Sequence, residues 1–216
     1  MIETAIILAA GRGSKIWPYG DTWAKAALPV ANRAVLLWQM EALKKCGISK
    51  FIIVIGHLGG QLRRQIPEDK SIHWVEQKHT TGTADGLTEA LKYAQDSEFL
   101  VVYGDVLFGF EDVKALLPTS PEDDGVAALV QSLNGSPSQE WLCASVDQGM
   151  ITGILGHPRE AVFRLCGVYR FTEKVLPHIT NHPGFMLSVE VGAMPPQEAE
   201  LAESISNFIQ HGGKVR

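Results

Sequence analysis

The sequence predicts an α/β protein, a three-layer sandwich in which helices cover both faces of a mixed, mainly parallel sheet. Short apolar runs typical of buried strands alternate with segments of helical periodicity through the first half of the chain. Strands that alternate with helices in this way form crossover units, and crossover units produce parallel strands. The first apolar run also leads into a glycine-rich turn, and turns at strand ends are where sheets of this class bind ligands.

Four strands are expected in the first half, because each is a short apolar run of the length that buried strands have. They span Ala5–Ala9, Phe51–Ile55, Ile72–Glu76 and Phe99–Val102. Helices are expected at 36–46, Ala84–Ala94 and Phe110–Leu117. In the first two of these, apolar residues recur every three or four positions, which places them on one helical face.

The second half contains strand-like runs that are not separated by long helices. These runs span 126–133, 141–147, 151–155 and 163–171, and the dipeptide Gln148-Gly149 between two of them is typical of a hairpin turn. Loops are expected at 134–139, 181–183 and 194–196, a last helix at Glu198–Gln210, and the start of a strand at 214–216. We therefore expect one domain over residues 1–216, with halves of about 1–108 and 109–216.

Composition excludes several classes of protein. The 216 residues carry a formal net charge of −5, whereas a general nucleic-acid binder is usually basic. No apolar run approaches the roughly 20 residues of a membrane helix, and the N-terminal run lacks the basic flank of a signal peptide. Cys46, Cys143 and Cys166 are isolated and odd in number, which indicates small buried side chains in a reducing compartment. We expect a cytoplasmic protein that binds neither membrane nor nucleic acid.

The turn after the first strand has the residues of a phosphate-binding loop. Gly11 and Gly13 leave backbone N–H groups accessible, and Lys15 and Lys25 follow with positive charge. Asp105 follows a later strand, and the carboxyl ends of parallel strands meet at one edge of a sheet. Mg²⁺ typically takes one or two carboxylates together with phosphate oxygens, so Asp105 is a candidate Mg²⁺ ligand.

Taken in order, these motifs resemble those of the sugar-1-phosphate nucleotidylyltransferases. The resemblance rests on Leu8–Pro18 (LAAGRGSKIWP), on Lys25 before Leu28-Pro29, on Gly82-Thr83-Ala84 and on Gly104-Asp105. Trp74-Val75-x-Gln77 and Tyr103–Val106 are most similar to the N-acetylglucosamine-1-phosphate uridylyltransferase branch, in its pyrophosphorylase domain only. The resemblance implies a Rossmann-like fold of the nucleotide-diphospho-sugar transferase type.

The same resemblance implies an activity and a set of site residues. The expected reaction is Mg²⁺-dependent transfer of a nucleotidyl group from a nucleoside triphosphate to a sugar 1-phosphate, with UTP favoured and dTTP and GTP open. Lys15, Lys25 and Asp105 would be catalytic, and Asp105 would hold the metal. Gly167 and Glu190 are candidate acceptor contacts. The expected nucleotide-binding residues are Leu8, Ala9, Ala10, Gly11, Gly13, Gln77, Gly82, Thr83 and Gly104.

The chain also departs from the family pattern. Lys15 stands where the family has arginine, and Ala24 where it has proline. Gly156 and Leu165 fall where the uridylyltransferase branch has a sugar-binding glutamate and asparagine, so the identity of the sugar is open. The family's second metal ligand has no counterpart before Arg216, and we expect either that the chain stops short of it or that it is lacking.

Other interpretations stay open at this point. A non-catalytic or regulatory relative and a cytidylyltransferase with a non-sugar acceptor, such as phosphocholine, remain alternatives, and a homo-oligomer is left open. Trp17, Trp23 and Trp38 are interpreted as packing residues rather than base-stacking ones. His57 is interpreted as structural, because it has neither a nucleophile nor metal-ligand spacing around it.

Overall fold

The structure is a computed structural model, and it divides into two compact units. The first comprises residues 1–80 and 86–117, and the second comprises 81–85 and 118–216. The residues that the structure describes are 2–79, 81–118, 126–138, 141–156, 158, 160–179 and 199–216. Among these residues, no helix combines the length and the apolar character that crossing a membrane requires.

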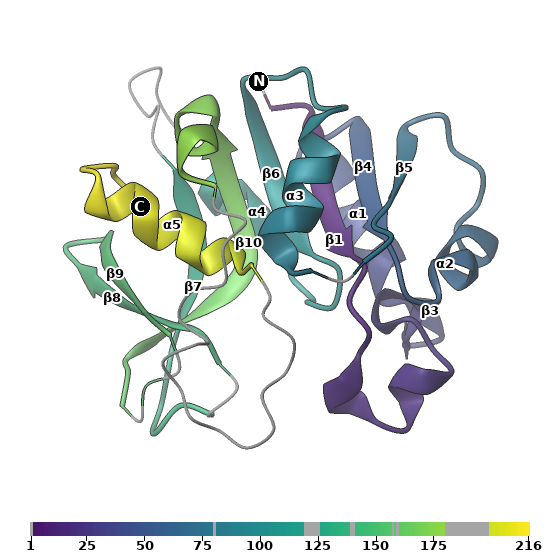
Figure 1. Ribbon diagram of the computed structural model, residues 1–216, viewed down its shortest axis with the longest axis horizontal. Coiled ribbons are helices and arrows are strands. Elements are labelled where there is room, and N and C mark those ends of the chain that lie inside the picture. The colour runs from purple at the N-terminus through teal and green to yellow at the C-terminus, as the bar shows by residue number, and fades with distance from the viewer. Residues whose placement is uncertain are drawn as a thin grey trace. The chain divides into compact units, whose positions relative to one another are not determined.

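The first unit is built on a parallel sheet (Figure 1). Its strands are β1 (Thr4–Ala9), β4 (Lys50–Ile55), β5 (Ile72–Glu76) and β6 (Glu98–Tyr103), in the order β5-β4-β1-β6. Ala5 of the central strand pairs with Phe51 on one side and with Leu100 on the other. Each of the four strands begins and ends within about one residue of its predicted bounds. Strands that are covered by helices on both faces are apolar along their length, so an apolar run marks where such a strand begins and ends.

Helices cover both faces of this sheet. In Figure 1, α3 (Thr83–Leu91) lies in front of the strands and α1 (Val35–Lys45) lies behind them, while α4 (Phe110–Leu116) contacts α1. Leu36, Met40 and Leu43 of α1 are buried, as their spacing predicted. The helix ends where Gly47 adopts a φ of 89°, a conformation that glycine takes without strain. The layered arrangement of the predicted sandwich is thus present in this unit.

Sequence periodicity did not predict the shorter elements of the first unit. Helix α2 (Gly59–Gln65) begins with two glycines, and Leu62 is its only buried residue with an apolar side chain, so no repeat of apolar positions marks it. Three 3₁₀ turns, at Ser14–Ile16, Tyr19–Asp21 and Lys25–Ala27, shape the segment after β1. The strands β2 (Pro29–Val30) and β3 (Arg33–Ala34) then form a small antiparallel hairpin.

The second unit contains an antiparallel sheet. Its strands are β7 (Ala127–Ser132), β8 (Cys143–Asp147), β9 (Met150–Gly156) and β10 (Phe163–Thr172). β10 pairs with β7 and with β8, and β8 pairs with β9. The turn between β8 and β9 is the predicted hairpin, because Gln148 and Gly149 both have positive φ, as a type I′ turn requires.

Helix α5 (Leu201–Gln210) packs against β9 and against the 3₁₀ segment Glu173–His178 in the second unit. It begins at Leu201, three residues after the predicted start at Glu198, a residue outside the described part of the chain. The predicted loops at 181–183 and 194–196 also lie outside it. Val215 forms single bridges with Val126 and Ile151, so the strand expected at 214–216 is present only as bridge pairing.

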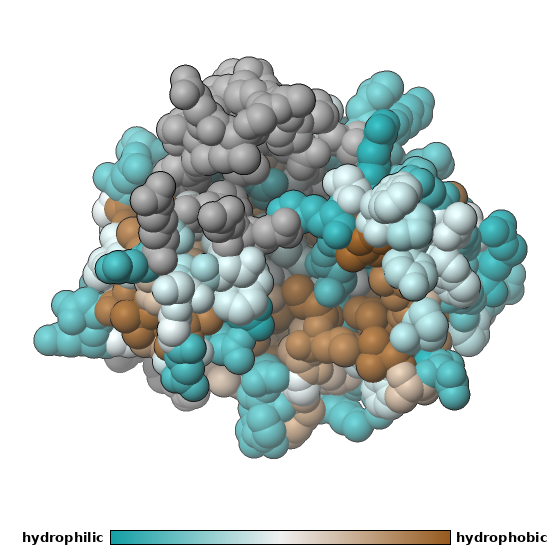
Figure 2. Space-filling model, turned by 90° about the horizontal axis from the view of Figure 1, so that it is seen from below, coloured by the Kyte–Doolittle hydropathy of each residue, from teal (hydrophilic) through white to brown (hydrophobic). Residues whose placement is uncertain are grey.

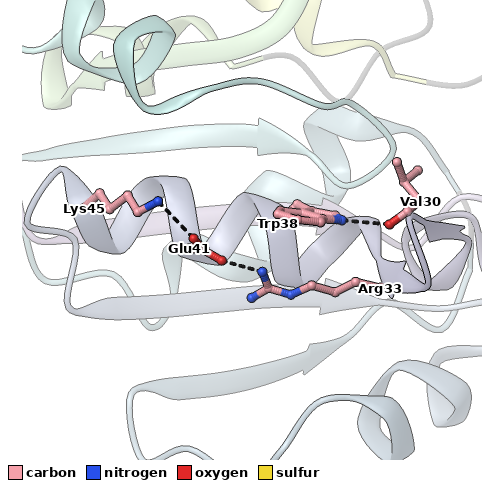
Figure 3. Close-up of polar contacts among 5 residues, drawn as sticks. All are labelled: Val30, Arg33, Trp38, Glu41 and Lys45. Atoms are coloured by element: carbon pink, nitrogen blue, oxygen red, sulfur yellow. Dashed lines mark hydrogen bonds and ion pairs between the residues drawn. The ribbon is translucent and has the colours of Figure 1, made fainter.

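A polar cluster holds the β2–β3 hairpin against α1 (Figure 3). Glu41 accepts hydrogen bonds from Arg33 and, at 2.9 Å, from Lys45, while the Arg33 guanidinium lies 4.6 Å from the centre of the Trp38 ring. The Trp38 indole N–H donates to the Val30 carbonyl at 2.9 Å. The hydrogen bonds from Arg33 and Lys45 lower the pKa of Glu41 to about 2.

This pKa shift predicts a pH-dependent contribution to stability. Because the pKa of Glu41 is lowered on folding from 4.5 to about 2, its ionised form stabilises the folded chain above about pH 4.5. The stabilisation is lost as the pH falls toward 2. We expect Glu41→Gln to lower the urea midpoint slightly at pH 6, because surface pairs contribute little, and the difference from the wild type to shrink below pH 4.5. Glu111→Gln, on α4, is the control, and a difference that grows on acidification would contradict the assignment.

Candidate functional site

The predicted phosphate loop follows β1 and is largely open to solvent. Gly11 and Lys15 are exposed, and Ile16 N donates to the Gly13 carbonyl at 3.0 Å, which closes a tight turn. Gly13 has a φ of 72°, and an added Cβ would lie 3.2 Å from Cγ of Lys25. Glycine is therefore required at position 13 by its backbone conformation, and its lack of a side chain lets the stem of Lys25 lie against the loop.

Lys25 and Asp105 meet in an ion pair, although 80 residues separate them. Lys25 Nζ lies 2.6 Å from Asp105 Oδ2, and their side chains are 28% and 38% exposed. Lys25 begins a 3₁₀ turn whose next two residues, Ala26 and Ala27, are buried, so its backbone is fixed while its side chain stays partly exposed. A pair this exposed adds little stability, and it matters here because two of the predicted catalytic residues face each other.

The end of β6 lies unusually close to the end of β1. Gly104 N donates to the Leu8 carbonyl at 2.8 Å, and an added Cβ at Gly104 would lie 2.7 Å from Cβ of Ala9. Any other residue at 104 would push the two strand ends apart. The absence of a side chain at Gly104 thus places the next residue, Asp105, beside the segment that follows β1.

Gln77 lies just beyond β5, where its backbone N–H donates to the Ile55 carbonyl at 2.8 Å. Gln77 is only 7% exposed. A Cβ added at Gly86 of α3 would lie 3.3 Å from Oε1 of Gln77 and 3.7 Å from Leu8, so the three residues are close together. The structure therefore brings Leu8, Gln77 and Gly86 together at the carboxyl end of the sheet in the first unit.

Gly82 and Thr83 belong to the second unit, where they contact the start of α5. Ala84 N donates to the Ala199 carbonyl, and Ala199 N donates to the Thr81 carbonyl. The Thr83 hydroxyl donates to Glu200 at 3.0 Å and accepts from Leu201 N at 2.8 Å, so it caps the first turn of α5. An added Cβ at Gly82 would lie 2.3 Å from the Ala199 carbonyl oxygen. These contacts give both residues a structural role, and their contact with a base stays a prediction.

The two predicted acceptor residues are not brought together by the described part of the chain. Gly167 is buried within β10, with a φ of 70°, where the register against β7 shifts between Leu165 and Tyr169. Glu190 lies outside the described residues. Both assignments therefore stay predictions.

Asp105 would supply one carboxylate ligand to a metal ion whose other ligands are phosphate oxygens and water. Among the described residues, no group of three or more His, Cys, Asp or Glu side chains could hold a metal ion alone. A single carboxylate at a strand end leaves most of the coordination sphere for phosphate oxygens and water, as Mg²⁺ prefers. The residues present thus suit a metal that arrives with its substrate.

Two of the three cysteines have a raised pKa. All three are free, and burial is the main cause that raises the pKa of Cys46 and of Cys143 above that of an ordinary thiol. A raised pKa keeps these groups as thiols rather than nucleophilic thiolates. The prediction of a buried side chain is confirmed for Cys143, whereas Cys46 and Cys166 are half-buried.

Two side chains just after β4 contact the loop before Lys25, and sequence reasoning missed one of them, Gln61. The His57 ring lies with Nε2 3.1 Å from the Gly20 carbonyl, which supports its structural interpretation. Gln61 of α2 accepts from Ala24 N at 3.0 Å and donates to the Thr22 carbonyl at 2.5 Å. The available signal was their place just after β4, at the same sheet edge as Asp105.

The aromatic residues of the loop are more exposed than predicted. The packing interpretation is wrong for Trp17, whose side chain is 75% exposed, and Trp23 is also exposed. Trp38 packs as expected, beneath Arg33. Figure 2 shows the face seen from below Figure 1, where hydrophobic residues (brown) lie among hydrophilic ones (teal).

Comparison with known proteins identifies the family. The MobA-like NTP transferase domain family matches residues 5–175, and the chain belongs to this family. The chain is 27% identical over 224 residues to a glucose-1-phosphate thymidylyltransferase of Streptomyces antibioticus, a match that covers 98% of this chain and 59% of the relative. It is 26% identical over 211 residues to the bifunctional protein GlmU of Marinobacter nauticus, covering 97% and 45%. The chain thus spans about half the length of these curated relatives.

Solved structures show the same fold. A UDP-glucose pyrophosphorylase complexed with UDP-glucose matches with a TM-score of 0.83 and 15% identity, covering all of this chain and 90% of the other. An inositol-1-phosphate CTP transferase from T. maritima matches with a TM-score of 0.78 and 18% identity, covering 100% and 84%. The predicted nucleotide-diphospho-sugar transferase fold and the predicted family are confirmed. The uridylyltransferase branch is not singled out by these matches.

The contact between the ends of β1 and β6 predicts a sharp difference between two glycines. Gly104→Ala should destabilise the chain by about 1–3 kcal/mol, because its new methyl group would overlap Ala9. Gly11→Ala is the control, since an added Cβ there meets nothing within 4 Å. Urea unfolding of both variants measures the difference, and equal midpoints would contradict the close approach.

Proposed function

We propose that this chain catalyses Mg²⁺-dependent nucleotidyl transfer from a nucleoside triphosphate to a sugar 1-phosphate, giving a nucleoside diphosphate sugar and pyrophosphate. The observation that carries the proposal is the pairing of Lys25 with Asp105 at 2.6 Å, beside a glycine-rich turn at the end of β1. Membership of an NTP transferase family and relatives named as nucleotidyltransferases support it. UTP is the favoured donor, on the resemblance of Gln77 and Gly82-Thr83 to the uridylyl branch.

The chemistry requires charge neutralisation and alignment rather than covalent catalysis. An oxygen of the sugar phosphate attacks the α-phosphorus of the triphosphate, a new P–O bond forms, and the bond to the departing pyrophosphate breaks. Backbone N–H groups of the turn at Gly11 and Gly13, of which Gly11 is exposed and Gly13 buried, would bind the phosphates. Lys25 would contact the reacting phosphates, and Lys15 would stabilise the leaving pyrophosphate, with a point charge rather than the fork of an arginine.

Asp105 would hold Mg²⁺, which would add positive charge at the phosphates when bound. The carboxylate is partly exposed, so substrate phosphates and a metal can reach it. In this arrangement Asp105 would bind Mg²⁺ in place of the Lys25 ammonium group, which would then be available to a substrate phosphate. We further propose that the halves of about 1–108 and 109–216 serve the nucleotide and the acceptor, with Gly167 and Glu190 on the acceptor side.

Replacing either member of the pair should slow turnover with little change in fold. We expect Lys25→Met and Asp105→Asn each to lower the rate of pyrophosphate release by about 100-fold or more, the usual effect of removing one transition-state contact. Lys92→Met is the matched control, because Lys92 forms a pair of equal length, 2.6 Å, with Glu89 on α3. Near-normal turnover in either site variant, with an intact circular dichroism spectrum, would reject the assignment.

The donor and acceptor are found by crossing UTP, dTTP, GTP and CTP against sugar 1-phosphates, inositol 1-phosphate and phosphocholine. The proposal expects the highest kcat/KM with UTP and a sugar 1-phosphate. Inositol 1-phosphate is included because a protein of the same fold is named for it, and phosphocholine tests a non-sugar acceptor. Nucleotide binding without release of pyrophosphate by any pair would favour a regulatory relative instead.

A further inference from the structure

We propose that Gln61 is a positioning residue for Lys25, an inference that rests on the proposed function. Gln61 lies on α2, an element that the proposed mechanism does not otherwise use. Its side-chain amide contacts the backbone on both sides of Trp23, at Thr22 and Ala24, immediately before Lys25. Through these two contacts it would determine where the backbone of Lys25 lies.

The two hydrogen bonds use both ends of the amide. Oε1 accepts from Ala24 N at 3.0 Å, and Nε2 donates to the Thr22 carbonyl at 2.5 Å. A group that must accept and donate at once, toward two backbone atoms, has one orientation only. Leucine, similar in size, provides neither bond, and glutamate at neutral pH provides only the acceptor.

The base of this contact is rigid. Gly59, the first residue of α2, lies against β4 so closely that an added Cβ would be 2.9 Å from Cβ of Ile55. Leu62, the residue after Gln61, is fully buried. Helix α2 also contacts the 3₁₀ turn Lys25–Ala27. Gln61 therefore projects from a fixed helix onto the segment that carries the catalytic lysine.

A second contact from the same segment supports the loop further upstream. His57 Nε2 lies 3.1 Å from the Gly20 carbonyl oxygen. Because a carbonyl oxygen is an acceptor, His57 is the donor of this hydrogen bond. Gly20 in turn lies against the phosphate turn, since an added Cβ there would be 2.3 Å from the Gly13 carbonyl oxygen. The segment from His57 to Gln61 thus contacts both Gly20, beside the phosphate turn, and the backbone just before Lys25.

The role of such a residue is catalytic geometry rather than overall stability. Lys25 reaches Asp105 through a long, flexible side chain, so its useful range depends on the position of its backbone. A displacement of about 1 Å at a reacting group can lower a rate by about 100-fold. Loss of Gln61 should therefore affect kcat more than KM for the nucleotide.

The test combines turnover with a readout that does not depend on activity. Gln61→Leu removes both hydrogen bonds, Gln61→Glu keeps the acceptor for Ala24 N, and Gln65→Leu alters an exposed glutamine on the same helix. We expect amide hydrogen exchange at Ala24 to become several-fold faster in Gln61→Leu and to stay close to wild type in Gln65→Leu. Gln61→Glu should lie between them, because it keeps the acceptor for Ala24 N but turns a second acceptor oxygen toward the Thr22 carbonyl. We expect kcat to fall about 10- to 100-fold in Gln61→Leu, with partial recovery in Gln61→Glu.

The outcomes separate this inference from the proposed function. Faster exchange at Ala24 with an unchanged kcat, or unchanged exchange at Ala24 in Gln61→Leu, overturns the positioning role. A loss of kcat that only follows a lower melting temperature, with Gln61→Glu no better than Gln61→Leu, overturns it as well. A wild-type chain that releases no pyrophosphate with any donor and acceptor overturns the proposed function itself, and the catalytic part of this inference with it.

Discussion

Gly104 allows the end of β6 to lie against the end of β1, and the arrangement of the candidate site depends on that contact. Its amide donates to the Leu8 carbonyl, and there is no room for a side chain between it and Ala9. Asp105 therefore lies beside the loop that follows β1, where it forms an ion pair with Lys25. Two stretches of chain about 80 residues apart thus meet next to a position where the structure leaves no room for a Cβ atom.

The electrostatic character of the site follows from its partial exposure. Lys25 and Asp105 neutralise each other, yet neither is buried, so the cost of separating them is modest. A polyphosphate with its metal carries charges of both signs, so under the proposed function it would offer each member of the pair a new partner of opposite charge. The backbone around the pair is held more firmly than the pair itself, by buried Ala26 and Ala27 and by the contacts of Gln61. These contacts hold the backbone that carries Lys25 in place without any ligand.

The sequence predicted those features that depend on local pattern. Continuous apolar runs mark β1, β4 and β6, and the glycines at 11 and 13 mark the turn, because each signal is contained within a few residues. Helix α2 was missed because its glycines and charged residues leave Leu62 alone as an apolar position. The exposure of Trp17 was missed because composition says nothing of which face of a loop meets solvent.

Contacts between residues far apart in the sequence could not be predicted from it. Thr83 was assigned to the base by resemblance, whereas its hydroxyl also caps α5 through Leu201, 118 positions later. Gln61 carried no motif, and its role follows only from the folded loop that it contacts. The motifs assigned Lys25 and Asp105 to the same site, but their direct contact is seen only in the structure.

A structure of the chain bound to a nucleoside triphosphate and Mg²⁺ is the measurement that tests the central claim most directly. The account predicts phosphates at the turn of Gly11 and Gly13, the Lys25 ammonium moved from Asp105 to a phosphate oxygen, and the Asp105 carboxylate on the metal. A nucleotide bound elsewhere, or one bound with the Lys25–Asp105 pair still closed and no metal at Asp105, would contradict it.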